Sequence, residues 1–167
     1  MTRLQKLTRC ALLTAAALVV FVIEAQIPPL TAIPGIKPGL SNIFTLFALR
    51  VLGPGWALAL LLLRVSLGSV ITGQMMAFLY SMAGGLLAFS VMAALRRLPE
   101  NRLWVASVFA AMAHNVGQLA AAIAVTGTRQ LLYYLPVLLL SGIVSGSFTG
   151  LCAQLVLQKL RKNRGFQ

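Results

Sequence analysis

The stretch from Leu103 to Val125, LWVASVFAAMAHNVGQLAAAIAV, decides the fold class of this chain. It contains no charged residue and exceeds the roughly 20 residues that a helix needs to cross the hydrocarbon core of a bilayer. Its centre nevertheless carries three polar side chains, those of His114, Asn115 and Gln118. The stretch therefore predicts a membrane-spanning helix with a polar cluster at mid-depth.

The remainder of the 167 residues has the same apolar character. Hydrophobic residues make up 59% of the chain and charged residues 10%, whereas a soluble domain carries about 25% charged residues. Apolar segments predict spans at about residues 9–25, 40–52, 56–72, 74–95, 103–125 and 131–157. We expect an all-α integral membrane protein of about six transmembrane helices, forming one polytopic domain over residues 1–167. The second segment is short enough to be re-entrant or tilted.

Basic residues gather at the predicted ends of these spans. They form three clusters: Arg3, Lys6 and Arg9; Arg96, Arg97 and Arg102; and Lys159, Arg161, Lys162 and Arg164. The positive-inside rule places all three clusters and both termini in the cytoplasm, and leaves only Lys37 and Arg129 in the outer loops. The formal net charge of +12 then needs no polyanionic partner. Because nucleic-acid-binding motifs are also missing, we expect no binding to nucleic acid.

Few residues could support catalysis. The only carboxylates are those of Glu24 and Glu100, and the chain contains no aspartate, so an aspartate-rich magnesium site is ruled out. Cys10 and Cys152 have no spacing typical of a metal site and are interpreted as small packing residues. We therefore expect neither an enzymatic activity nor a metal or cofactor.

A charged residue inside a span is a candidate functional residue. Arg64 lies near the middle of the third span, where a central arginine costs about 2.5 to 3.5 kcal/mol on insertion scales. Glu24, near the outer end of the first span, is the one acidic candidate partner within the bundle. Two interpretations stay open: a structural Arg64–Glu24 pair, or an arginine that meets an anionic ligand group.

The polar cluster of the fifth span also allows two interpretations. His114 and Gln118 are four residues apart and share a helix face, while Asn115 lies about 100° round. These groups either pack within the bundle or bind a ligand in a pocket that opens outward. The predicted topology places further polar residues in the outer half or at the centre: Asn42, Lys37, Gln74, Tyr133 and Tyr134. The tyrosines equally fit an interfacial aromatic belt.

Small residues recur at a spacing of four. The last span contains Gly142, Gly146 and Gly150, and the first contains Ala11 and Ala15. Such spacing lets another helix approach closely, through packing within the bundle or through docking of a partner.

Several of these segments together resemble a known family. The segments are Pro34–Ile43, Leu63–Val65 with Gly68-Ser69, Ala83–Leu86, His114–Gln118 and Tyr133–Pro136. In this order they resemble the bacterial family labelled heptaprenyl diphosphate synthase component I, also called the Gx transporter family. That family is similar in turn to the substrate-binding S components of energy-coupling factor (ECF) transporters, which are six-helix membrane proteins that capture a micronutrient from outside.

The resemblance implies partners and a location. In S components, a small-residue face on the first helix docks a membrane coupling protein linked to two ATPase subunits; Ala11 and Ala15 match that face. The chain has no nucleotide-binding loop of its own, so partners would use the ATP. The resemblance further implies a multi-pass protein of the bacterial cytoplasmic membrane.

Three functional hypotheses follow. The leading one is a substrate-binding subunit of an uptake transporter, with a small-molecule substrate that is anionic or isoprenoid-related. The second is a non-catalytic accessory subunit of polyprenyl diphosphate or quinone metabolism. The third is a structural membrane partner of redox proteins.

Overall fold

The computed structural model describes residues 2–26 and 39–164, and this part of the chain consists of helices and short connections. The six α-helices are α1 (Arg3–Gln26), α2 (Asn42–Val51), α3 (Pro54–Thr72), α4 (Met75–Ala94), α5 (Leu103–Thr126) and α6 (Leu135–Arg164). Three short 3₁₀ helices, η1 (Leu95–Arg97), η2 (Glu100–Arg102) and η3 (Arg129–Tyr134), lie in the connections. The predicted all-α membrane fold is confirmed, although η3 occupies the expected start of the last span and α6 begins only at Leu135.

Local sequence chemistry sets several helix ends. Pro54 occupies the first turn of α3. A backbone N–H in that turn has no partner within the helix, so the N–H that proline lacks costs no helical hydrogen bond. Gly73 and Gly127 follow the last residues of α3 and α5 with φ angles of 66° and 68°. This left-handed conformation ends a helix and favours glycine because glycine lacks a Cβ atom.

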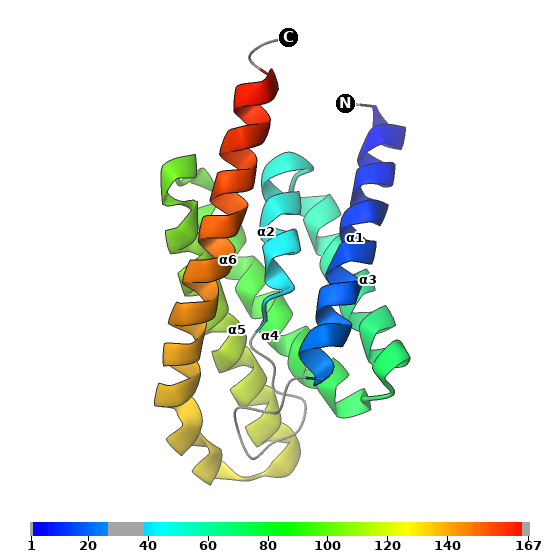
Figure 1. The fold of residues 1–167 in the computed structure, drawn as a ribbon. Helices are drawn as coiled ribbons and strands as arrows, with labels where there is room; N and C mark the ends of the chain where they lie inside the picture. The colour runs from blue at the N-terminus through cyan, green and yellow to red at the C-terminus, as the bar shows by residue number, and fades with distance from the viewer. Residues whose placement is uncertain (1, 27–38, 165–167) are drawn as a thin grey trace.

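Five of the helical segments are long and apolar enough to cross a membrane, and α2 is the exception. Its 10 residues span about 15 Å, which is half of a hydrocarbon core roughly 30 Å thick. Figure 1 shows α2 confined to the half of the bundle nearest the two chain ends. The short predicted second span is therefore a half-helix whose first turn lies at mid-depth.

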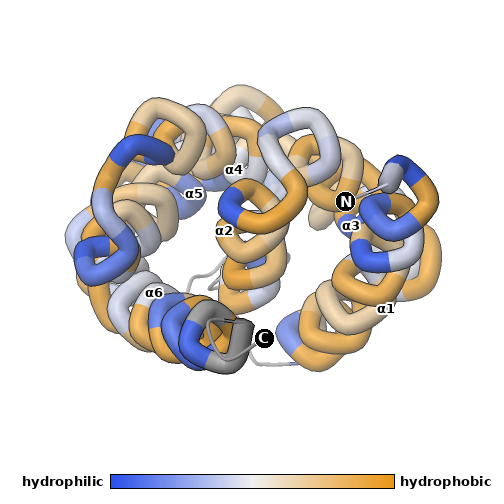
Figure 2. The backbone as a smooth tube through the Cα atoms, turned by 90° about the horizontal axis from the view of Figure 1, so that it is seen from above, coloured by the Kyte–Doolittle hydropathy of each residue, from blue (hydrophilic) through white to orange (hydrophobic). Residues whose placement is uncertain are grey.

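The other five helices surround α2. Seen along the bundle axis, α1, α3, α4, α5 and α6 form a ring with α2 inside it (Figure 2). Each of the five contacts α2, and successive contacts join α1 to α3, α3 to α4, α4 to α5 and α5 to α6. The start of α2 is thus placed near the centre of the molecule.

Glycines on α6 bring it against α5. A Cβ atom on Gly146 would lie 2.7 Å from Cα of Val108, and one on Gly150 would lie 2.6 Å from Cα of Trp104. Both distances are far below a normal carbon–carbon contact, so only glycine fits at this crossing. The small-residue pattern of the last span therefore serves packing within the bundle.

The outer surface of the bundle is apolar, as a lipid-facing surface must be. Val70, Met75 and Val144 are 75%, 74% and 71% exposed, and large exposed hydrophobic residues occur on every long helix. Unpaired backbone groups in lipid cost several kcal/mol each, and helices satisfy those groups internally. The chain is an integral membrane protein.

The start of α1, the end of α6 and the joint between α4 and α5 lie at one end of the bundle (Figure 1). Arg96, Arg97 and Arg102 in that joint are exposed. We call this the basic end and the opposite side the far end.

Because the positive-inside rule puts the basic end in the cytoplasm, reporter fusions at Gln167 and near Pro99 should read cytoplasmic. A fusion near Thr128, in the connection between α5 and α6, should read external. An external signal at Gln167 would contradict the predicted topology.

Candidate ligand site at the start of α2

A buried carboxylate holds the start of α2. Glu24, near the end of α1, is 2% exposed, and its Oε1 accepts a hydrogen bond of 2.5 Å from the backbone N–H of Leu40. Its Oε2 accepts one of 3.1 Å from the N–H of Ser41. The first N–H groups of a helix have no partner within the helix, and the positive end of its dipole favours an anion. Glu24 therefore holds the two residues that lead into α2 from a neighbouring helix.

A buried arginine holds the same turn from the other side. Arg64, in the middle of α3, is 2% exposed and donates from Nη1 to Oγ of Ser41 and from Nη2 to Oδ1 of Asn42, the latter over 3.0 Å. In the described part of the chain Arg64 forms no direct hydrogen bond with Glu24, although the two charges attract each other. The predicted Arg64–Glu24 pair is thus a bridge through Ser41.

The histidine of α5 lies beside this bridge. A Cβ atom on Gly39 would be 2.9 Å from Cδ2 of His114 and 3.0 Å from Nδ2 of Asn42, so the imidazole and the amide flank Gly39. Gly39 has a φ of 77°. The polar residues of α1, α2, α3 and α5 therefore converge on one turn of backbone.

A glycine on α4 makes room for the second polar side chain of α5. A Cβ atom on Gly84 would lie 2.7 Å from Cγ of Gln118 and 3.0 Å from Nδ1 of His114. Gly117 brings the two helices together, since its own Cβ position is 2.8 Å from Cα of Gly84. As their spacing predicts, His114 and Gln118 share the face of α5 that meets α4.

Asn115 points in another direction. Its Nδ2 donates a hydrogen bond of 2.6 Å to the backbone carbonyl oxygen of Leu138 on α6. This bond ties α5 to α6, while Oδ1 of Asn115 is buried without a hydrogen-bond partner among the described residues.

Several buried polar atoms around the start of α2 have no hydrogen-bond partner among the described residues. They include Nδ2 of Asn42 and Nε of Arg64, together with Nε2 and Oε1 of Gln118, which is completely buried one helical turn along α5 from His114. Leaving a buried polar group unsatisfied costs about 1 to 3 kcal/mol, so native proteins contain few. A polar ligand that satisfies these atoms would recover that free energy.

The other predicted site residues lie elsewhere. Tyr133, on η3 at the far end, is 83% exposed, and Gln74 is also exposed. Ala11 and Ala15 are exposed on α1, where a partner could reach them. Lys37 lies outside the described residues.

Ser41 was not singled out as a site residue by the sequence analysis. A serine at the start of a helix usually caps that helix with its own side chain, but Ser41 makes no such bond and its Oγ accepts from Arg64 instead. The feature of the sequence that could have identified Ser41 is its position beside Asn42 in the segment Pro34–Ile43.

The residues described here provide no cluster for a metal ion. Within residues 2–26 and 39–164, no three histidine, cysteine, aspartate or glutamate side chains lie together. Cys10 is buried, and its Sγ is 3.7 Å from the carbonyl oxygen of Trp56.

The fold and the site define an all-helical integral membrane protein with a charge-bearing polar cluster at its centre. Residues 13–156 match the family described as heptaprenyl diphosphate synthase component I, and the chain belongs to that family. No curated protein and no solved structure matches the chain significantly.

The bridge predicts that Ser41→Ala destabilises the protein, because the substitution leaves a buried Arg64 donor unpaired. We expect a loss of about 1 to 3 kcal/mol, measured by thermal or denaturant unfolding in detergent. Ser90→Ala is the matched control: Ser90 is exposed and bonds only to the carbonyl oxygen of Leu86 in its own helix. Equal stability of the two variants would contradict the bridge.

Proposed function

We propose that the protein is the substrate-binding membrane subunit of a small-molecule uptake transporter in the bacterial cytoplasmic membrane. The observation that supports this most is the group of unpaired polar atoms on Asn42, Arg64 and Gln118 around the start of α2. They come from three different helices and lie at mid-depth, where lipid offers no hydrogen bonds. A polar ligand bound among these atoms would supply the hydrogen bonds that they lack.

The unpaired atoms define the chemistry of the ligand. Nε of Arg64 and Nδ2 of Asn42 are donors, so they require an oxygen acceptor such as a carboxylate, phosphate or carbonyl group. The Gln118 amide offers a donor and an acceptor together, which suits an amide, a hydroxyl or a heterocycle. We propose a small polar ligand that carries both kinds of group, with the His114 ring against it.

Transport also needs a source of energy. We propose that a membrane coupling protein with ATPase subunits supplies it, and that the chain itself catalyses no reaction. Ala11 and Ala15 support a docking surface because both are exposed on α1 and small enough for another helix to approach closely.

The description of the family favours a second candidate function. It names a component of heptaprenyl diphosphate synthase, which supports a role as an accessory subunit of polyprenyl diphosphate or quinone metabolism. Increased synthase activity on co-expression with the catalytic component, without a ligand bound at the start of α2, would favour this function over transport.

The ligand hypothesis predicts opposite effects of Gln118→Leu on binding and stability. The substitution removes two unpaired polar atoms, so thermal stability should be unchanged or higher. Native mass spectrometry of gently solubilised protein should show a co-purified small molecule whose affinity falls about five- to more than a hundredfold, equivalent to about 1 to 3 kcal/mol.

The matched control is Gln158→Leu, which alters an exposed glutamine near the basic end and should leave the ligand bound. If Gln118→Leu retains the same small molecule at wild-type affinity, the binding site is not at Gln118.

The docking hypothesis predicts that Ala15→Trp abolishes assembly with the coupling protein, and with it uptake, because the indole prevents close helix approach. Folding and ligand affinity should be unchanged, since Ala15 is exposed. Ile23→Trp, at an exposed position two turns further along α1, is the control and should assemble normally. Normal uptake by Ala15→Trp would show that this face of α1 is not the docking surface.

A further inference from the structure

An apolar groove lies between α1 and α6, on the opposite side of α2 from the polar site. The groove has two hollows. The upper hollow, nearer the basic end, has a volume of about 310 Å³, and the lower hollow, nearer the start of α2, has a volume of about 160 Å³. Leu13 and Phe47 line both hollows. Figure 2 shows that α1 and α6 stand apart here, with α2 behind the opening. The groove therefore opens sideways, toward the lipid.

The wall of the groove is suited to a hydrocarbon chain. Ile43, Phe44, Phe47 and Val51 of α2 form its floor, spaced so that they follow one helix face. Val156 and Ala153 of α6 complete the lower hollow, and Leu160 the upper one. These lining residues are apolar, so this part of the groove offers a chain dispersion contacts but no hydrogen bonds.

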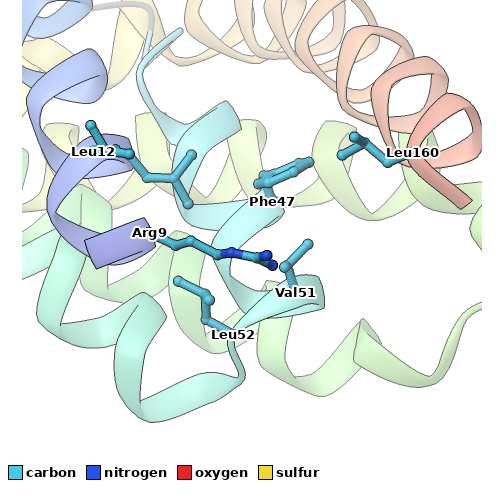
Figure 3. A pocket seen from close by; sticks show the side chains of 7 residues that line it. Arg9, Leu12, Phe47, Val51, Leu52 and Leu160 are labelled. Carbon is cyan, nitrogen blue, oxygen red and sulfur yellow. The ribbon is translucent and has the colours of Figure 1, made fainter. Parts of the chain in front are cut away.

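Among the described residues that line the groove, Arg9 carries a charge. Arg9 of α1 extends across the upper hollow toward Val51 at the end of α2 (Figure 3). This places a cation at the basic end of the groove and hydrocarbon below it.

The length of the groove matches one leaflet of a bilayer. From Ile43 to Val51 the floor rises over eight residues, which is about 12 Å along the helix axis. Half of the hydrocarbon core is about 15 Å thick. A chain anchored at the membrane surface of the basic end would therefore reach the bottom of the groove and stop at mid-depth, where α2 begins.

We infer that this groove binds an anionic phospholipid from the leaflet at the basic end, with the phosphate at Arg9 and one acyl chain along α2. The charge of Arg9 distinguishes this from the ordinary lipid contacts of a membrane protein, because a neutral lipid would gain nothing from it. The inference concerns a different face of α2 from the polar site and does not depend on the proposed transport function.

Photo-crosslinking in vesicles tests the inference directly. The protein is reconstituted in phosphatidylcholine vesicles that contain a trace of phosphatidylglycerol or phosphatidylcholine, each with the same diazirine-bearing acyl chain. Labelling between Ile43 and Val51 is compared by mass spectrometry with labelling at Val70, an exposed residue on the outer surface of α3. We expect about fivefold preferential labelling of α2 by phosphatidylglycerol, equivalent to about 1 kcal/mol for one basic side chain at an anionic lipid.

Two pairs of variants separate the groove from general attraction to the membrane. Arg9→Gln should abolish the preference for phosphatidylglycerol and Arg9→Lys should keep it, whereas Arg3→Gln removes an exposed charge of the same helix and should change little. Val156→Trp fills the lower hollow and should reduce labelling of α2 by both lipids. The control Val144→Trp alters an exposed site on α6 outside the groove and should not.

Equal labelling of α2 by the two lipids would show ordinary lipid contact and overturn the inference. So would an unchanged preference in Arg9→Gln, or the absence of label on α2 from either lipid while Val70 is labelled.

Discussion

Two hydrogen bonds from the backbone of Leu40 and Ser41 to the carboxylate of Glu24 fix the point at which α2 begins. A helix that starts at mid-depth in a membrane exposes N–H groups that neither water nor lipid can satisfy. The carboxylate satisfies the N–H groups of the two residues that lead into α2 and places a negative charge at the positive end of the helix dipole. Because it belongs to α1, it also fixes how α1 lies against α2. The half-helix can exist inside the bundle because this acceptor is provided.

Arg64 is the counterpart of that carboxylate. A lone buried carboxylate or guanidinium is strongly unfavourable, whereas two opposite charges joined through Ser41 compensate each other. This arrangement directs two nitrogens of Arg64 to Ser41 and Asn42 and leaves Nε unpaired beside the other unpaired atoms of the cluster. The network that stabilises the fold thereby also creates the hydrogen-bonding capacity on which the proposed ligand site depends.

The two faces of α2 serve different environments. Asn42 and Thr45 are buried toward the bundle, while Phe44 and Phe47 line the groove between α1 and α6. A polar ligand on one side and a lipid chain on the other would therefore contact the same short helix. Since each of the other five helices also contacts α2, a shift of this helix would change its packing against all five.

The sequence alone determined the helical membrane class, because lengths and apolar composition fix which segments can enter a bilayer. It also indicated that His114 and Gln118 share a face, since helical periodicity is a local property. The spacing could not show that Glu24 and Arg64 meet through Ser41, that Asn115 turns away to Leu138, or that Tyr133 stays exposed. Each of these depends on how helices distant in the chain approach and rotate against one another. That is decided by glycine-mediated packing between helices, such as Gly84 against Gly117, which only the tertiary structure contains.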